Sequence, residues 1–307
     1  MSNAVLDRII LPPDIARPMD QSWTVEAAYA YCSRLTRSHY ENFPVGSFLM
    51  PKALQPAVHS LYAFMRTADD FSDEQRRPGD EAERSAYLAS WDQMLDACEK
   101  GQAQHPIFIA LRETLRRYRL PVQWLHDLLT AFKMDVTVRR YPTYLHLMNY
   151  CRYSANPVGR LILTLFGYRS EDLYQLSDAI CTGLQLANHW QDVAIDLEKD
   201  RIYLPLDDLK RFDVSVAALE RRVCSPAFQE LLRFQVQRTR ELFTRGESLP
   251  RRVRGRLSWE LRMTWEGGTR ILDKVEAVDY DVFAHRPTVT KFDWILLGLR
   301  SLWPSYE

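Results

Sequence analysis

The strongest constraint on the fold is an apolar periodicity close to that of an α-helix, which recurs along almost the whole 307-residue chain. Prolines interrupt this pattern and stand near the starts of several segments, where a helix tolerates them. The chain contains only 11 glycines, although sheet proteins and nucleotide-binding α/β folds usually need more for tight turns and phosphate loops. No run of alternating apolar and polar residues indicates a strand. The sequence therefore predicts an all-α protein.

The predicted helices follow one another with short interruptions. They cover residues 22–40, 56–73, 81–99, 106–118, 121–138, 142–166, 171–198, 215–223, 226–245, 250–278 and 288–302. No shift in composition marks a boundary between domains. We therefore expect an irregular N-terminal segment over residues 1–20 and a single helical domain over residues 21–305.

Charge and cysteine content exclude several classes of function. The 40 basic and 40 acidic side chains give a net charge of zero, without the basic surface that is typical of nucleic-acid-binding proteins. The five cysteines are dispersed and lack the spacing of a metal site, which indicates reduced thiols in a cytoplasmic protein. No signal peptide and no membrane-spanning apolar run are found. We expect a cytoplasmic protein, and peripheral contact with the inner face of the membrane is an expectation to be tested.

The first group of candidate functional residues lies at the end of the helix predicted over residues 56–73. Tyr62, Arg66, Asp69 and Asp73 are spaced 4, 3 and 4 residues apart, so they share one helix face, the first stripe. Neighbouring carboxylates repel one another and oppose the helix dipole at this end, and each effect costs a few tenths to about 1 kcal/mol. We infer that a cation compensates for these carboxylates.

The second group lies in the helix predicted over residues 171–198. Gln185, Asn188, Asp192 and Asp196 are spaced 3, 4 and 4 residues apart and form the second stripe, which Asp200 continues by one turn. Apolar residues stand between them, so this helix faces the core and carries a polar stripe. Burying that stripe without partners would cost several kcal/mol, and its oxygen donors suit Mg²⁺.

Taken together, the two stripes favour a polynuclear Mg²⁺ site that binds a diphosphate, although helix caps or ion pairs would explain either stripe alone. Asp92 and Asp96 have the same spacing without flanking polar groups, and we interpret them as a solvent-exposed face. No Glu has a His three residues later, as di-iron helical bundles require, and the phosphate-loop motifs GxxxxGK and GxGxxG are absent. A non-catalytic helical scaffold, with both stripes in solvent, stays an alternative.

These residues resemble the squalene/phytoene synthase family of head-to-head isoprenoid synthases, and the likeness covers residues 25 to 300. The family's motifs match Asp69-Asp70-Phe71-Ser72-Asp73, then Asn188 to Asp196 followed by Arg201-Ile202-Tyr203-Leu204-Pro205, and a third stretch over residues 150–159 that contains Tyr150. Residues 42–45 and 154–160 look like the bacterial hopanoid-associated branch HpnC, whose members are called squalene or hydroxysqualene synthases. The chain departs from the family's common pattern at Asn156-Pro157, where a proline would kink a helix.

The resemblance implies a class I isoprenoid (terpenoid) synthase, a single-domain helical bundle around a central cavity. It implies that presqualene diphosphate is ionised and that water quenches the cation to give hydroxysqualene. Alternatives are a reductive squalene synthase that uses NADPH, or a presqualene diphosphate or phytoene synthase that joins two prenyl diphosphates. Mg²⁺ is expected as three ions with the diphosphate, held by Asp69, Asp73, Asn188, Asp192 and Asp196. NADPH is not expected under the first of these reactions.

The remaining site residues have expected roles in the same reaction. Tyr62 and Tyr150, with Phe43 and Phe64 behind them, are expected to stabilise the cation through their ring faces. Arg66 and Arg201 are expected to bind the diphosphate, Tyr203 to contact the substrate, and Gln185 or a tyrosine hydroxyl to position water. Gly267-Gly268 fits either close helix packing or space for a long isoprenoid chain.

Overall fold

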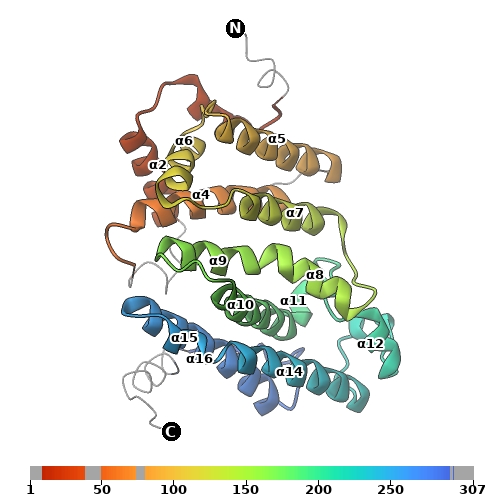
Figure 1. The fold of residues 1–307 in the computed structure, drawn as a ribbon. Helices are drawn as coiled ribbons and strands as arrows, with labels where there is room; N and C mark the ends of the chain where they lie inside the picture. The colour runs from red at the N-terminus through yellow and green to blue at the C-terminus, as the bar shows by residue number, and fades with distance from the viewer. Residues whose placement is uncertain (1–8, 39–49, 74–79, 291–292, 294–307) are drawn as a thin grey trace. The chain divides into compact units, whose positions relative to one another are not determined.

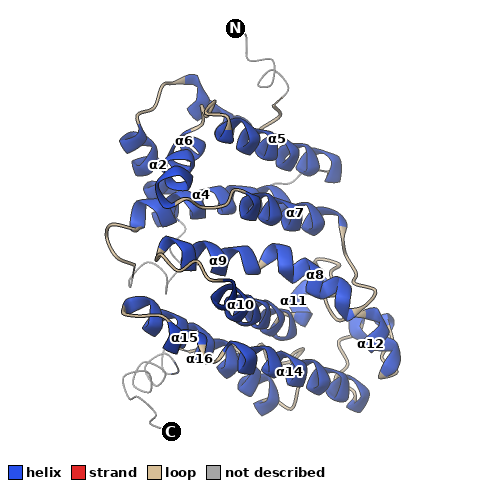
Figure 2. Ribbon diagram, in the orientation of Figure 1, coloured by secondary structure: helices blue, strands red, loops and turns tan. Residues whose placement is uncertain are grey.

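The computed structural model describes residues 9–38, 50–73, 80–290 and 293, and these residues fold into helices (Figures 1 and 2). Within them, the β-pairing is limited to one parallel bridge between Arg140 and Ile202. The all-α prediction is therefore confirmed. Among the described helices, none is both long and apolar enough to cross a membrane.

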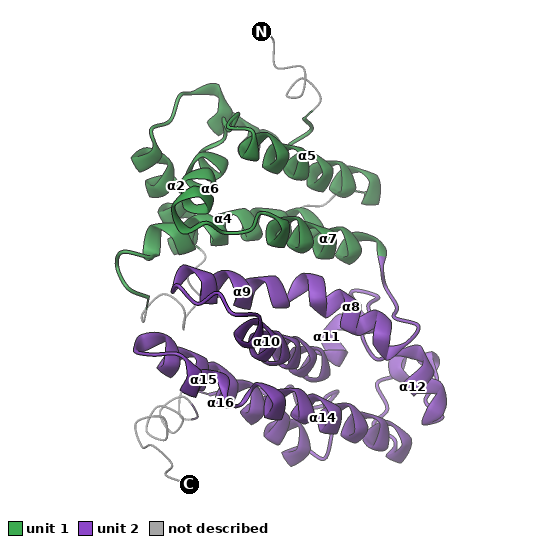
Figure 3. Ribbon diagram, in the orientation of Figure 1, with its two compact units in different colours: residues 1–137 green, residues 138–307 purple. Residues whose placement is uncertain are grey.

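The chain forms two compact units, Met1–Thr137 and Val138–Glu307 (Figure 3). The first unit contains α1 (Pro13–Ala16), η2 (Arg17–Asp20), α2 (Val25–Ser38), α4 (Gln55–Ser72), α5 (Glu81–Glu99), α6 (Pro106–Tyr118) and α7 (Gln123–Thr137). The short helices α1 and η2 lie within residues 1–20, where the sequence predicts an irregular segment. Each has a proline within its first two positions, where the fixed φ of proline favours a helical turn.

The core of the first unit is an aromatic cluster beneath α4. Phe64 and Phe71 on α4 and Trp91 on α5 are fully buried. The Phe71 and Trp91 rings meet edge to face with centroids 5.6 Å apart, an arrangement favoured by the ring quadrupoles. The Trp91 indole also donates a hydrogen bond to the Phe64 carbonyl at 3.3 Å. These contacts fix α4, so the polar side chains on its other face have a rigid support.

The second unit is built around the long helix α10. Its helices are α8 (Tyr144–Ser154), α9 (Asn156–Leu165), α10 (Glu171–Gln191), α11 (Val193–Glu198), α12 (Leu206–Arg211), α13 (Val216–Glu220), α14 (Pro226–Gly246), α15 (Leu249–Arg252) and α16 (Arg256–Ala277). Helices α9, α14 and α16 all pack against α10. Gln185 and Asn188 of the second stripe therefore lie on a helix that is held on several sides.

Three of the predicted helices are interrupted, and one observed helix was not predicted. The helix predicted over residues 142–166 breaks at Ala155, because Pro157 lacks an N–H and occupies the first turn of α9. The helix predicted over 171–198 breaks at Asp192, and the one predicted over 250–278 breaks at residues 253–255. Helix α12 lies where no helix was predicted. The helix predicted over 288–302 lies almost entirely outside the described residues.

Helices α10, α14 and α16 approach one another closely at Phe243. A Cβ atom at Gly268 would lie 2.5 Å from Phe243 Cζ and 2.6 Å from Leu184 Cδ2. On α10, a Cβ at Gly183 would lie 3.2 Å from the same ring. This geometry supports the close-packing interpretation of Gly267-Gly268.

Candidate functional site

The first stripe lies on α4 and at its C-terminal end. Tyr62, Arg66 and Asp69 are helical, and Asp73 is the C-cap residue. The Asp73 backbone N–H donates to the Asp69 carbonyl at 3.0 Å, so the two aspartates stay one helical turn apart. The spacing inferred from the sequence is therefore preserved up to the last residue of the motif.

Two arginines supply positive charge at this end of α4. The Arg66 guanidinium lies 3.2 Å from the Asp70 carboxylate and 3.7 Å from that of Asp69. Arg84 on α5 is buried and donates to the Ser72 carbonyl at 3.2 Å, in the last turn of α4. Positive charge at a helix C-terminus is favourable, so both groups offset the carboxylates.

Sequence reasoning missed Arg84, although a signal was present. Arg84 lies on the same helix face as Leu88, Trp91 and Leu95, and all four residues are buried. An arginine at a core-facing position needs a partner. That partner is the Ser72 carbonyl in the last turn of α4.

The second stripe persists across the break between α10 and α11. Asp192 has non-helical φ and ψ angles of −105° and 12°. Its backbone N–H nevertheless donates to the Asn188 carbonyl, and that of Asp196 donates to the Asp192 carbonyl, both at 2.9 Å. Helical hydrogen bonding thus continues along the row, and the three residues keep the spacing of successive turns.

Asp200 does not continue this row, contrary to the prediction. Helix α11 ends at Glu198, and Asp200 adopts a left-handed conformation with φ of 53°. Its carboxylate forms an ion pair with Arg140 instead. The left-handed residue turns the chain away from the helix axis, and an aspartate tolerates this conformation better than most residues.

After this turn, the chain runs beside residues 139–142 in the same unit. The Ile202 N–H donates to the Arg139 carbonyl at 3.0 Å, and the Leu206 N–H donates to the Tyr141 carbonyl at 2.9 Å. These bonds hold the segment that contains Arg201 and Tyr203. Both predicted site residues are therefore positioned by backbone pairing.

Tyr203 lies at the centre of an aromatic cluster. Its ring stacks on His189 with centroids 3.6 Å apart and on Tyr141 at 5.5 Å, and it contacts Tyr150 at 5.9 Å. His189 is buried, and this burial lowers its pKa to about 3, so the imidazole is neutral. Gln185 Nε2 lies 3.4 Å from His189 Nε2. Sequence reasoning assigned no site role to Tyr141, which has no helical periodicity to link it to this cluster.

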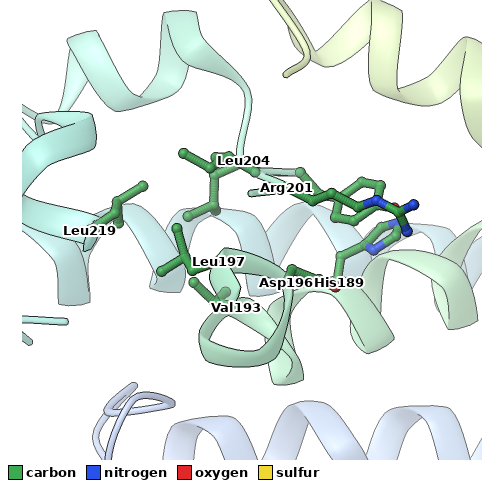
Figure 4. Close-up of a pocket in the computed structure, with 9 residues that line it drawn as sticks. His189, Val193, Asp196, Leu197, Arg201, Leu204 and Leu219 are labelled. Carbon is green, nitrogen blue, oxygen red and sulfur yellow. The ribbon is translucent and has the colours of Figure 1, made fainter. Parts of the chain in front are cut away.

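A small pocket lies beside the second stripe (Figure 4). Its lining residues are His189, Val193, Asp196, Leu197, Arg201, Ile202, Tyr203, Leu204 and Leu219. The labelled leucines lie on one side, whereas Arg201 and His189 lie on the other. The space that the pocket encloses is about 10 Å³, which is room for about one water molecule.

The candidate metal ligands of both stripes offer oxygen donors. Asp69 and Asp73 belong to the first unit, and Asn188, Asp192 and Asp196 belong to the second. Carboxylate and amide oxygens are hard ligands, which fit Mg²⁺ better than a soft metal. The Asp192 carboxylate is bound by Arg286, a residue that sequence reasoning missed.

Two further predicted residues have no support from their positions. Phe64 is fully buried between Trp91 and Phe108, with ring centroids 6.1 and 5.8 Å away. This packing makes Phe64 a core residue of the first unit and gives no support to the predicted contact with substrate. Phe43 lies outside the described residues.

The aspartates interpreted as a solvent-exposed face belong to a network of ion pairs. Asp92 accepts a hydrogen bond from His126 Nδ1 at 2.6 Å and contacts Lys133. Asp96, Glu99 and His126 have potential metal-ligand atoms within 4.8 Å of one another. Both carboxylate residues of that group are exposed, and His126 contacts Asp92 and Asp96.

Comparison with known proteins identifies the family. The family model described as squalene/phytoene synthase matches residues 36–293. Hydroxysqualene synthase of Rhodopseudomonas palustris is 36% identical over 242 residues, which is 78% of this chain and 80% of that protein. Phytoene synthase of Arthrospira platensis is 31% identical over 275 residues, 85% of this chain and 88% of that protein.

A solved structure agrees with these matches. The squalene synthase HpnC from Alicyclobacillus acidocaldarius superposes with a TM-score of 0.79 and 36% identity, over 90% of this chain and 98% of that one. The residues matched by the family model, 36–293, include the helices that carry both stripes. The chain therefore belongs to the squalene/phytoene synthase family.

Proposed function

We propose that this protein is a hydroxysqualene synthase, which converts presqualene diphosphate and water to hydroxysqualene and diphosphate. The observation that carries the proposal is the arrangement in the second unit, where an oxygen-donor stripe adjoins a neutral aromatic cluster. When an isoprenoid diphosphate ionises, the oxygen-donor stripe can bind the departing diphosphate through metal ions, and the aromatic cluster can stabilise the carbocation. The choice of this reaction rests on the 36% identity to hydroxysqualene synthase.

The departing diphosphate would be held by both stripes. Asp69, Asp73, Asn188, Asp192 and Asp196 would bind Mg²⁺, which supplies positive charge to stabilise the leaving group. Arg201 lines the pocket beside Asp196, where its guanidinium can donate to diphosphate oxygens. We propose the same role for Arg66, which pairs with Asp70 in its own motif.

The aromatic cluster would face the hydrocarbon cation. The rings of Tyr150 and Tyr203, with Tyr141 behind them, would each stabilise a nearby cation by roughly 0.5–2 kcal/mol. Tyr62 is proposed to do the same from the first unit. His189 is neutral because of its burial, so it adds no positive charge that would oppose the cation.

Water would end the reaction. The carbon–oxygen bond to diphosphate breaks, a new bond forms between the cation and the water oxygen, and one water proton passes to the released diphosphate. The Gln185 amide, held near His189, is proposed to position this water. Because the released diphosphate accepts the water proton, the reaction requires no protein side chain as a base.

A second candidate is phytoene synthase activity, because the phytoene synthase of Arthrospira platensis matches a larger share of this chain. The test incubates the purified protein and Mg²⁺ with presqualene diphosphate, farnesyl diphosphate or geranylgeranyl diphosphate, with and without NADPH, followed by mass spectrometry. Hydroxysqualene from presqualene diphosphate without NADPH supports the proposal. Squalene that forms only with NADPH, or phytoene from geranylgeranyl diphosphate, refutes it.

The metal assignment has a matched control within the chain. Asp69→Asn and Asp192→Asn should abolish most activity, whereas Asp96→Asn removes an exposed carboxylate with the same spacing outside both stripes and should change little. Full activity of either stripe variant would refute the assignment. Because the proposed product is a lipid, we also propose a cytoplasmic protein with peripheral membrane contact, which liposome flotation tests.

A further inference from the structure

The carboxylate of Asp192 is occupied by an arginine that lies 94 residues later in the chain. Arg286 Nε donates to Asp192 Oδ1 at 2.6 Å, and Arg286 Nη2 donates to Asp192 Oδ2 at 3.1 Å. The two parallel bonds form the bidentate geometry that makes guanidinium–carboxylate pairs strong. Both oxygens of this stripe residue are therefore engaged by one cation.

The chain around Arg286 is held at both sides, so the contact is not a chance approach of a free side chain. Before it, the ring of Phe283 packs on that of Phe228 with centroids 4.6 Å apart. After it, the buried carboxylate of Asp293 binds Lys274 Nζ at 2.6 Å. Both partners belong to the long helices α14 and α16. These two anchors present Arg286 to Asp192.

The electrostatic surroundings favour the guanidinium at this position. The pKa of Arg286 is raised, first by its hydrogen bond to Asp192 and further by the charges of Asp192 and Asp196. The Asp192 side chain is 13% exposed, so solvent screens the pair only partly. Arg286 thus neutralises the Asp192 carboxylate.

We infer that Arg286 sets the metal affinity of the second stripe, because a metal ion can bind the Asp192 carboxylate fully only by displacing it. The inference rests on the proposed function, which takes Asp192 as a metal ligand. Displacement exchanges one cation for another on the same two oxygens, and the released guanidinium moves into solvent. Removing Arg286 therefore removes a competitor and tightens metal binding.

The experiment measures Mn²⁺ binding to the full chain by the EPR signal of the free ion, without diphosphate or substrate. Arg286→Ala should lower the dissociation constant by roughly three- to tenfold, as expected for loss of a partly buried charged pair. Arg286→Lys keeps the positive charge but loses the bidentate geometry, so its dissociation constant should lie between those of the wild type and Arg286→Ala. The matched control is Arg222→Ala, because Arg222 is 43% exposed against 48% for Arg286 and pairs with Glu198 at 2.9 Å in the same unit.

A double-mutant cycle assigns the effect to this pair. In an Asp192→Asn background, Arg286→Ala should no longer change Mn²⁺ affinity. If the wild type binds Mn²⁺ and Arg286→Ala binds it equally or more weakly, the inference about Arg286 is overturned, whereas the proposed metal site is not. Absence of Mn²⁺ binding in the wild type and in every variant overturns the metal site of the proposed function as well.

Discussion

Replacing Gly268 by alanine tests whether α10, α14 and α16 are in direct contact at Phe243. The new methyl group would lie 2.5 Å from Phe243 Cζ and 2.6 Å from Leu184 Cδ2, whereas carbon atoms pack best at about 3.5–4.0 Å. Overpacking of this kind costs about 1–3 kcal/mol, and two severe contacts place the cost near the upper end. Alanine recovers about 1 kcal/mol through its helix propensity. We expect a net loss of about 2 kcal/mol.

The matched control is Gly183→Ala, which approaches the same ring from α10. Its methyl group would lie 3.2 Å from the Phe243 ring, a contact that small shifts relieve. Here the gain in helix propensity should nearly balance the strain, so the free energy of unfolding should change by less than about 1 kcal/mol. Urea unfolding, followed by tryptophan fluorescence and circular dichroism, measures both variants.

The reasoning is refuted if Gly268→Ala is as stable as Gly183→Ala. If Gly268→Ala keeps its stability but accepts a different length of prenyl diphosphate, the alternative interpretation of Gly267-Gly268 as space for the isoprenoid chain gains support. Both outcomes are read from the same preparation, because substrate profiles can be measured on the folded fraction. The test therefore separates helix packing from substrate fit.

Three more predictions concern single side chains, namely Glu260, Arg84 and His189. Burial raises the pKa of Glu260 to about 7, so the native protein loses stability as the pH rises above the unfolded-state pKa of 4.5. Glu260→Gln should therefore raise the free energy of unfolding by about 2–3 kcal/mol at pH 8 and leave it almost unchanged at pH 4. Urea unfolding at both pH values measures this difference, and equal effects at the two pH values contradict it. Arg84→Met should cost about 2–3 kcal/mol in the same assay, whereas Arg112→Ala, which loses a solvent-exposed bond to a carbonyl, should cost less than about 1 kcal/mol. His189→Phe should keep the stack on Tyr203 but lose the contact with Gln185, so its kcat should fall between that of the wild type and that of His189→Ala, which should be at least about tenfold lower than the wild type. Equal kcat values for the two variants would refute a positioning role of the stack.

Local helix geometry explains which features could be predicted from the sequence. Asp69 and Asp73, like Asn188 and Asp192, are neighbours on one face because three- and four-residue spacings recur within a helix, and such spacings are visible in the sequence. The same reasoning extended the row to Asp200, and it failed there because a single left-handed residue ends the periodicity. Periodicity therefore predicts residues within an element and not where the element stops.

Contacts between elements could not be predicted in this way. Tyr141 meets Tyr203 because residues 139–142 pair with residues 202–207 through backbone hydrogen bonds, which carry no signal in side-chain spacing. Arg286 reaches Asp192 through the packing of the chain after α16. Such contacts depend on the tertiary fold, and a single sequence gives no distance between residues that are far apart along the chain.

The arginines change the argument about charge in the two stripes. From the sequence, carboxylates clustered in apolar helices predict that a metal ion supplies the missing positive charge. In the structure, Arg66 contacts Asp69 and Asp70, and Arg286 binds Asp192, so part of that charge comes from the chain itself. A divalent ion that binds these oxygens must break an existing ion pair, and its net binding free energy is the difference between two charge interactions. Metal binding is then an exchange of cations, and its affinity depends on how firmly each arginine is held as well as on the carboxylates.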